Sequence, residues 1–157
     1  MSTKLSPNLD LSTMIKSDKA ILLGIDNTPK SEEIIDNLRL LAENVYEKLF
    51  LKFGHNIIVN SGYRCPELNK AVRNSSSKSQ HMVGQAMDIE IPGISNYDLA
   101  KWVSENLDFD QLILENYVLG NPDSGWVHIS YKGSDNRKQI KTKKKDVDKL
   151  LDGLPAH

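Results

Sequence analysis

Three side chains in two short segments have the chemistry to bind one metal ion. The stretch SQHMVGQAMD contributes His81 and Asp88, and the stretch WVHIS contributes His128. Two imidazoles and one carboxylate are the ligand set of a catalytic zinc site, whose fourth position stays open to water. Such a zinc ion lowers the pKa of its bound water to about 7, so that hydroxide forms near neutral pH. The set therefore predicts one Zn²⁺ ion per chain and a hydrolase.

A single histidine in a sequence is weak evidence, because most histidines are ordinary surface or hydrogen-bonded residues. The chain has only four, and besides His81 and His128 these are His55 and His157. His157 is the last residue, where chain ends are commonly frayed. Few other histidine sites can therefore be built from this sequence.

The pattern around the three candidate ligands predicts how they meet. Side chains of a strand alternate between two faces. In the strand predicted at 86–91, Asp88 therefore points to one face and its apolar neighbour Ile89 points to the other. The same alternation in WVHIS places His128 on the face opposite Val127. If these two strands pair, Asp88 and His128 face one cleft, and His81 reaches it from the loop that precedes the first strand.

Composition and charge limit the class of protein. The chain has 157 residues, 39% of them hydrophobic and 26% charged, which fits one globular domain with a sizeable core. The net charge of -1 argues against a nucleic-acid-binding protein. No apolar run has the roughly 18 residues of a membrane span, and residues 1–10 lack the apolar core of a secretory signal. One cysteine, Cys65, excludes an internal disulfide.

The remaining sequence predicts an α+β fold, namely a small single domain with a central, mainly antiparallel sheet flanked by helices and the zinc site on that sheet. Helices are expected at 11–17, from Ser31 to just before Gly54, and at 66–72, 97–106 and 146–151, with Ser31 and Asn96 as N-caps. Strands are expected at 56–60, which is predicted to be buried, and at 86–91, 111–115 and 126–131. One domain covers 1–157, in which 1–28 wraps the rest and 137–157 is a basic C-terminal tail.

The lysine-rich run at 137–145 has two interpretations. A solvated charged surface is the more common meaning of such a run. The alternative is a patch that attracts a polyanion, such as an anionic cell-wall polymer or a membrane surface, through forces that salt screens.

Four segments together resemble a known family. SGYRCPELN, SQHMVGQAMDIEIPG, QLILE and WVHIS are similar to the M15 peptidases, which are D-alanyl-D-alanine carboxypeptidases and L-alanyl-D-glutamate endopeptidases, and most of all to their phage-type branch. The resemblance implies the D-Ala-D-Ala carboxypeptidase/hedgehog-like fold, a peptidoglycan peptide substrate, and zinc bound by His81, Asp88 and His128. Many of these enzymes carry an acidic residue three positions before the last histidine, where this chain has Gly125.

Hydrolysis also needs a general base and a substrate anchor. The base is a carboxylate within reach of the attacking water, and the candidates are Glu115, Asp123 and Glu90. Glu115 is preferred because the phage-type branch ends this strand with a glutamate, with Asp123 second. Glu90 is expected to orient a ligand.

The anchor is a planar cation, and the family's SGYR loop assigns this role to Arg64, whose guanidinium can grip a carboxylate with two hydrogen bonds. A structural arginine that ties the loop together is the alternative. Ser79, and also Ser130, can hydrogen-bond the substrate backbone or can serve the structure.

Two other functions stay open at this stage. In a Cys/His peptidase, the Cys65 thiolate would attack the peptide, although no histidine lies near it in sequence. A non-catalytic cell-wall-binding or virion structural module could also use the same scaffold. We expect a monomer made in the cytoplasm without a signal peptide, which acts on the cell wall after release or travels in a phage particle. Carboxypeptidase and endopeptidase differ in whether the cleft is closed or open beyond the cut.

Overall fold

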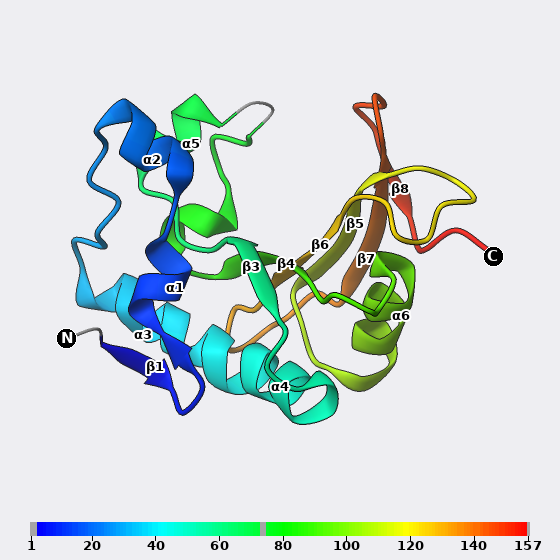
Figure 1. The fold of residues 1–157 in the computed structure, drawn as a ribbon, viewed down its shortest axis with the longest axis horizontal. Coiled ribbons are helices and arrows are strands. Elements are labelled where there is room, and N and C mark those ends of the chain that lie inside the picture. The colour runs from blue at the N-terminus through cyan, green and yellow to red at the C-terminus, as the bar shows by residue number, and fades with distance from the viewer. Residues whose placement is uncertain (1–2, 73–74, 157) are drawn as a thin grey trace.

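A six-stranded sheet crosses the molecule in the computed structural model, which describes residues 3–72 and 75–156 (Figure 1). In order across the sheet the strands are β3 (Ile58–Ser61), β4 (Ala86–Glu90), β6 (Trp126–Ser130), β5 (Gln111–Tyr117), β7 (Gln139–Lys144) and β8 (Leu150–Asp152). Every neighbouring pair is antiparallel except β5 and β7, which are parallel. The predicted α+β domain with a mainly antiparallel sheet is confirmed.

The longest helical segment covers one side of the sheet. It consists of α3 (Glu32–Leu41), the π-helix η1 (Ala42–Tyr46) and α4 (Glu47–Phe53). The hydroxyl of Ser31 accepts a hydrogen bond from the backbone N–H of Ile34, which is the predicted N-cap. The helix ends before Gly54 as predicted. The π-helical turn was not predicted, because the spacing of apolar residues does not distinguish one π-helical turn from an α-helical turn.

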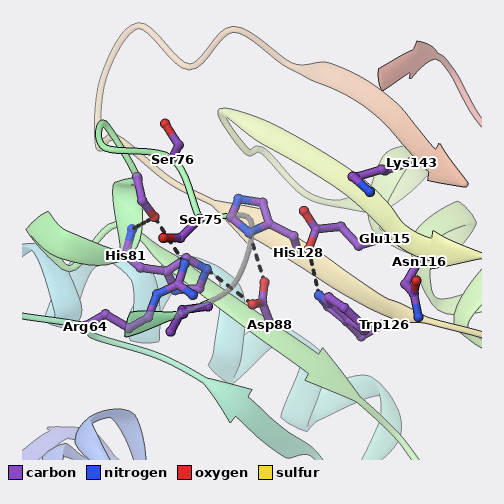
Figure 2. A pocket seen from close by; sticks show the side chains of 12 residues that line it. Arg64, Ser75, Ser76, His81, Asp88, Glu115, Asn116, Trp126, His128 and Lys143 are labelled. Atoms are coloured by element: carbon purple, nitrogen blue, oxygen red, sulfur yellow. Dashed lines mark hydrogen bonds and ion pairs between the residues drawn. The ribbon is translucent and has the colours of Figure 1, made fainter. Parts of the chain in front are cut away.

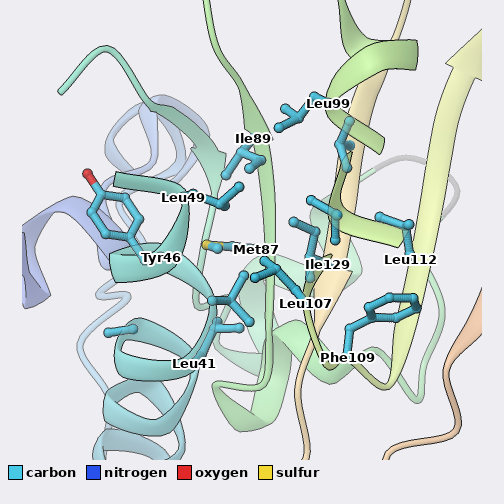
Figure 3. Close-up of a cluster of buried hydrophobic side chains, with 14 of the residues drawn as sticks. Leu41, Tyr46, Leu49, Met87, Ile89, Leu99, Leu107, Phe109, Leu112 and Ile129 are labelled. Atoms are coloured by element: carbon cyan, nitrogen blue, oxygen red, sulfur yellow. The ribbon is translucent and has the colours of Figure 1, made fainter. Parts of the chain in front are cut away.

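The core lies between this helical segment and the apolar face of the sheet (Figure 3). The strands supply cross-strand pairs to this face, such as Met87 with Ile129 and Ile89 with Val127. Leu41 and Leu49 of the helical segment are fully buried against them. Burial of each such side chain contributes roughly 1.5–3 kcal/mol, so the alternation of strand residues fixes which face is left for the site.

The N-terminal segment packs against the same core. It contains β1 (Lys4–Ser6), β2 (Leu9–Asp10), α1 (Leu11–Ile15) and α2 (Asp18–Leu23). The helix predicted at 11–17 is present as α1 but ends two residues early, since the chain is extended at Lys16 and Ser17, and the second helix that follows was not predicted. The Ser17 hydroxyl caps α2 by accepting from Ala20 N, so a capping residue inside the predicted helix separates two helices.

Three short helices complete the fold: α5 (Pro66–Ala71), the 3-10 helix η2 (Gln80–Val83) and α6 (Asn96–Asn106). The predicted cap of α6 is wrong by one residue, because Ser95 accepts from Asp98 N while Asn96 lies inside the helix. The strand predicted at 56–60 is β3, but its residues are exposed or half-buried rather than buried, since it is the edge strand of the sheet.

The basic C-terminal segment is part of the sheet. The helix predicted at 146–151 is wrong, and the expected tail instead supplies β7 and β8. Thr142 of β7 is buried and donates a hydrogen bond of 2.7 Å to the Gly153 carbonyl, while Lys141 forms an ion pair with Asp152. The sequence did not indicate this strand, because lysines occupy the positions that alternate with Ile140 and Thr142. His157, like residues 1, 2, 73 and 74, lies outside the described residues.

Among the helices of the described residues, none combines the length and the apolar composition that a bilayer crossing requires.

Candidate active site

The three predicted ligands converge on the polar face of the sheet (Figure 2). Asp88 of β4 and His128 of β6 are direct cross-strand partners, so the strand pairing on which the prediction depended is present. His81 reaches them from η2, which precedes β4. One ligand atom from each of the three residues lies within 4.8 Å of the other two, and all three side chains are buried.

The Asp88 carboxylate lies between the two imidazoles. Its Oδ1 is 2.9 Å from His128 Nδ1, and its Oδ2 is 3.3 Å from His81 Nε2. Burial by itself opposes ionisation of Asp88, but its contacts with His81 and His128 outweigh burial and lower the pKa of this carboxyl. Burial likewise opposes protonation of His128, yet the hydrogen bond with Asp88 raises the pKa of the imidazole. Asp88 is therefore an ionised carboxylate that lies between one nitrogen atom of each imidazole.

His81 is held in one orientation by its neighbours. Its Nδ1 donates a hydrogen bond of 2.7 Å to the Gly62 carbonyl, which leaves Nε2 as the atom that faces Asp88. Its backbone N–H donates to the hydroxyl of Ser79, the N-cap of η2, and its carbonyl accepts from Arg64 N. A backbone carbonyl on the second ring nitrogen is a usual support for a metal-binding histidine, because it fixes the tautomer.

Gly62 is a supporting residue that sequence reasoning missed. A Cβ atom at this position would lie 2.4 Å from the carbonyl oxygen of Met14, so only glycine allows α1 to approach this loop so closely. Tyr63 N donates a hydrogen bond of 2.7 Å to the same Met14 carbonyl. The N-terminal segment thus positions the carbonyl that orients His81. The sequence feature that could have identified this supporting residue was the glycine itself, in the segment from Ser61 to Arg64.

Glu115 projects into the same cavity, which encloses about 250 Å³ and is lined also by the three predicted ligands. Its Oε2 accepts a hydrogen bond of 2.7 Å from the indole Nε1 of Trp126. Burial raises the pKa of Glu115, and the negative charge of Asp88 raises it further, while His128 and the Trp126 hydrogen bond act in the opposite direction. A carboxylate with a raised pKa accepts and returns a proton more readily than an ordinary surface carboxylate, which suits a general base.

Arg64 and Ser79 also line this cavity. One terminal nitrogen of Arg64 donates to the Ser79 hydroxyl at 3.3 Å. The Arg64 Nε atom is buried and has no hydrogen-bond partner among the described residues. Burial lowers the pKa of the guanidinium, whereas the charges of Asp88 and Glu115 raise it. The cavity therefore contains a cation with an unused donor beside the metal-ligand group.

Asp123, the second candidate base, does not lie with the others. It is exposed and lines a separate hollow with Asn96 and Glu90. Asn96 Nδ2 donates to the carbonyls of Asp123 and Gly125, which fixes this loop at the start of β6. The Glu90 carboxylate accepts from Asn60 and Asn96, so its hydrogen bonds go to these amides rather than to a candidate ligand.

Two further candidates have structural roles. Ser130 is fully buried, and its hydroxyl accepts from Gln111 N at 2.9 Å, where β5 begins beside the end of β6. Cys65 is the N-cap of α5, where its Sγ accepts from Leu68 N. Neither residue is among those that line the cavity.

Many M15 enzymes carry an acidic residue where this chain has Gly125, and the structure gives a steric reason for the glycine. Gly125 has a φ of +73°, and a Cβ atom there would lie 1.8 Å from the carbonyl oxygen of Glu115. An acidic residue therefore does not fit at this position while β5 keeps its path. The carboxylate comes instead from Glu115, whose cross-strand partner Trp126 directly follows the glycine.

The cavity has further lining residues that the sequence did not single out. Asn116 follows Glu115 on β5, Ser75 and Ser76 come from the loop before η2, and Lys143 comes from β7. Figure 2 shows Lys143 and Glu115 on the same side of the cavity as His128. Lys143 belongs to the lysine-rich run that was interpreted as a solvated charged surface or a patch for a polyanion, so its place in the cavity could not be inferred before β7 was known.

The fold and the site together define a class of protein. A buried His–Asp–His group on a sheet, beside a carboxylate with a raised pKa, is the arrangement of a metal-dependent hydrolase. The family model described as Peptidase M15 matches residues 7–130 of this chain. Because the match covers most of the sequence, the chain belongs to the M15 peptidases, which are metallopeptidases. A search among curated proteins gave no match.

Proposed function

We propose that the protein is a zinc-dependent peptidase that hydrolyses peptide bonds in the stem peptides of peptidoglycan. The observation that carries this proposal is the convergence of His81, Asp88 and His128 in one cavity with Glu115 and Arg64. The family resemblance in the segments that supply these residues supports the substrate class. The phage-type branch is part of the same proposal.

The donor set fits zinc. Two imidazole nitrogens and one carboxylate oxygen are its common ligands in catalytic sites, and the three donor atoms here already lie within 4.8 Å of one another. The Gly62 carbonyl supports this fit, because it holds His81 with Nε2 toward the other donors. When bound, zinc supplies a Lewis acid that acidifies a water ligand and polarises the scissile carbonyl. We propose one ion per chain.

Glu115 is the proposed general base and acid. Its carboxylate takes a proton from the attacking water and later delivers that proton to the nitrogen of the leaving amine, as the peptide C–N bond breaks. The raised pKa of Glu115 supports both steps, since it brings the carboxyl closer to a balance between accepting and returning a proton than an ordinary glutamate has. Asp123 is not retained in this role, because it lines a different hollow.

Arg64 and Ser79 are the proposed substrate-binding residues. The buried Nε–H of Arg64, which lacks a partner in the described part of the chain, is available to a carboxylate or a carbonyl oxygen of the peptide near the cut. Ser79 holds the other side of the guanidinium and so limits its rotation. A planar cation fixed in this way orients the substrate before the reaction begins.

The setting of the reaction follows from the proposed substrate. A peptidoglycan hydrolase works on the bacterial cell wall, and we propose that this protein is made in the cytoplasm and meets the wall after release or from a phage particle. We further propose that it acts as a monomer and uses no nucleic acid.

Digestion of purified peptidoglycan tests the proposed function. We expect zinc-loaded protein to release peptide fragments detectable by mass spectrometry, and a chelator to stop the release until zinc is restored. Glu115→Gln should lower the rate by about 10²- to 10⁴-fold, the usual contribution of a general base, while zinc content stays at the level of the native protein. Zinc binding by native protein without any fragment release would contradict the proposal and favour a non-catalytic cell-wall-binding module.

A further inference from the structure

A second cavity adjoins the one that contains the candidate ligands. It encloses about 560 Å³, against about 250 Å³ for the first. Arg64, Asp88 and Trp126 line both cavities, as does Val72. The candidate metal ligand Asp88 therefore borders both cavities.

The walls of this second cavity come from parts of the chain that the catalytic proposal does not use. One wall is the turn between α1 and α2 with the start of α2, where Lys19 is exposed and Lys16 lies beside it, and the other includes Asn60 and Ser61 of β3. In Figure 1 this N-terminal region and the strands β5 and β7 lie on opposite sides of β4. Lys143 and Asn116 line only the first cavity, on the β5 and β7 side. A cavity therefore lies on each of two sides of the candidate ligands.

We propose that the two cavities form one groove, which holds residues of a peptide on both sides of the scissile bond, so that the enzyme cuts inside a peptide chain. This inference depends on the proposed peptidase function and makes its substrate more specific. An enzyme that removes a terminal residue needs a wall just beyond the cut, whereas here the larger cavity continues past Asp88.

Arg64 has a defined part in this groove. It lines both cavities, and its Nε–H is a buried donor without a partner in the described residues. A buried donor is stabilised when a ligand accepts from it. In an open groove, Arg64 forms part of the side wall and donates to a carbonyl or side-chain carboxylate of a passing peptide. Beyond Arg64 the wall contains Lys16 and Lys19 together with the carboxylates of Asp18 and Glu90. It therefore matches a polar peptide with charges of both signs, whose carboxylates would contact Lys16 and Lys19.

Two forms of one peptide test the inference. The first is a stem pentapeptide that ends in D-Ala-D-Ala with a free carboxylate, and the second is the same peptide acetylated at its N-terminus and amidated at its C-terminus. We expect zinc-loaded protein to cut both at the same internal bond, as seen by mass spectrometry. Release of the last residue from the free peptide only would overturn the open groove but leave the peptidase function in place. Cleavage of neither peptide would overturn both.

A binding experiment gives a second readout that does not depend on turnover. In the zinc-loaded Glu115→Gln protein, calorimetry would compare the blocked pentapeptide with a blocked dipeptide that covers only the cut bond. We expect the longer peptide to bind about tenfold more tightly, and Lys16→Ala with Lys19→Ala to reduce this advantage to about one, as loss of charge-assisted contacts implies. The matched control is Lys48→Ala with Lys52→Ala on α4. If Lys16→Ala with Lys19→Ala left the tighter binding of the longer peptide unchanged, the proposal of one groove would be overturned.

Discussion

The indole Nε1 of Trp126 donates a hydrogen bond of 2.7 Å to Oε2 of Glu115. The two residues are cross-strand partners in the β5–β6 pair, and both side chains reach the same cavity. The contact holds one carboxylate oxygen of Glu115, so the other oxygen is the one that the proposed mechanism assigns to the attacking water. It also opposes the effect of burial, because a donor stabilises the ionised form of the carboxyl.

Loss of this hydrogen bond should change the pH dependence of the reaction. The proposed base Glu115 can accept a proton only when it is ionised, so we expect activity to fall as the pH drops through its raised pKa. In Trp126→Phe the pKa rises further, since burial and the charge of Asp88 remain while the donor is gone. We therefore expect the acidic limb of the kcat profile to move to higher pH with little change in KM.

Trp102→Phe is the control for this experiment, because Trp102 contacts Phe53 and lies outside the cavity. Its profile should match that of the native protein. If the acidic limb of Trp126→Phe also stayed in place, Glu115 would not be the titrating base.

Gly125→Ala should destabilise the fold. The added Cβ would lie 1.8 Å from the Glu115 carbonyl oxygen, so the β5–β6 pair must shift to admit it. We expect a loss of about 3 kcal/mol or more in the free energy of unfolding, from backbone strain and the clash together. Gly120→Ala is the matched control, because Gly120 also has a positive φ but open space around its Cβ position. Its loss should be about 1 kcal/mol. Equal losses in urea unfolding would argue against the clash.

Asp110 should make stability depend on pH. Its buried carboxylate accepts hydrogen bonds from Arg137 and from Gln80, the neighbour of His81. Burial opposes ionisation, but the Arg137 hydrogen bonds outweigh it and lower the pKa of Asp110. The stabilisation is therefore complete above the carboxyl's unfolded pKa of about 3.9 and is lost as the pH falls through the lowered folded value.

Asp110→Asn should accordingly lower the free energy of unfolding at pH 7 by about 2 kcal/mol, the cost of losing charge-assisted hydrogen bonds. The difference from the native protein should shrink as the pH is lowered below about 4. Asp26→Asn is the control, since Asp26 pairs with Lys30 on the surface, where such pairs contribute little. A constant difference at every pH in urea unfolding would show that Asp110 acts by packing alone.

Removal of one candidate ligand should abolish tight metal binding. We expect His128→Ala to weaken zinc affinity by more than about 100-fold, since even loss of a hydrogen bond that supports a ligand costs 10- to 100-fold. His55→Ala is the control, because His55 is exposed and lies outside the cavity. Competition with a zinc-binding dye measures both, and equal affinities would exclude His128 as a ligand.

The central part of the fold followed from alternation alone. The apolar positions next to Asp88 and His128 have only one face on which to bury themselves, which predicts that both polar side chains turn to the other face. The structure has this arrangement, with the two residues directly paired. Glu115 was instead singled out by the resemblance to the phage-type branch, and the strand that contains it continues two residues beyond the predicted end, to Tyr117.

Other parts could not be inferred from the sequence, because they depend on contacts between distant segments. β7 contains four polar or charged side chains around Ile140 and Thr142, and its parallel pairing with β5 decides which of them turn inward. Gly62 is required only because Met14 approaches it. The sequence contains both residues but does not indicate that they meet.

The strand that contributes Lys143 begins after residue 130, where the match to the family ends. One side of the cavity is thus built by a segment outside the match to the family, whereas the candidate ligands and Glu115 lie inside it. We therefore expect substitutions in this last strand to change how a peptide fits the cavity while His81, Asp88 and His128 keep their positions.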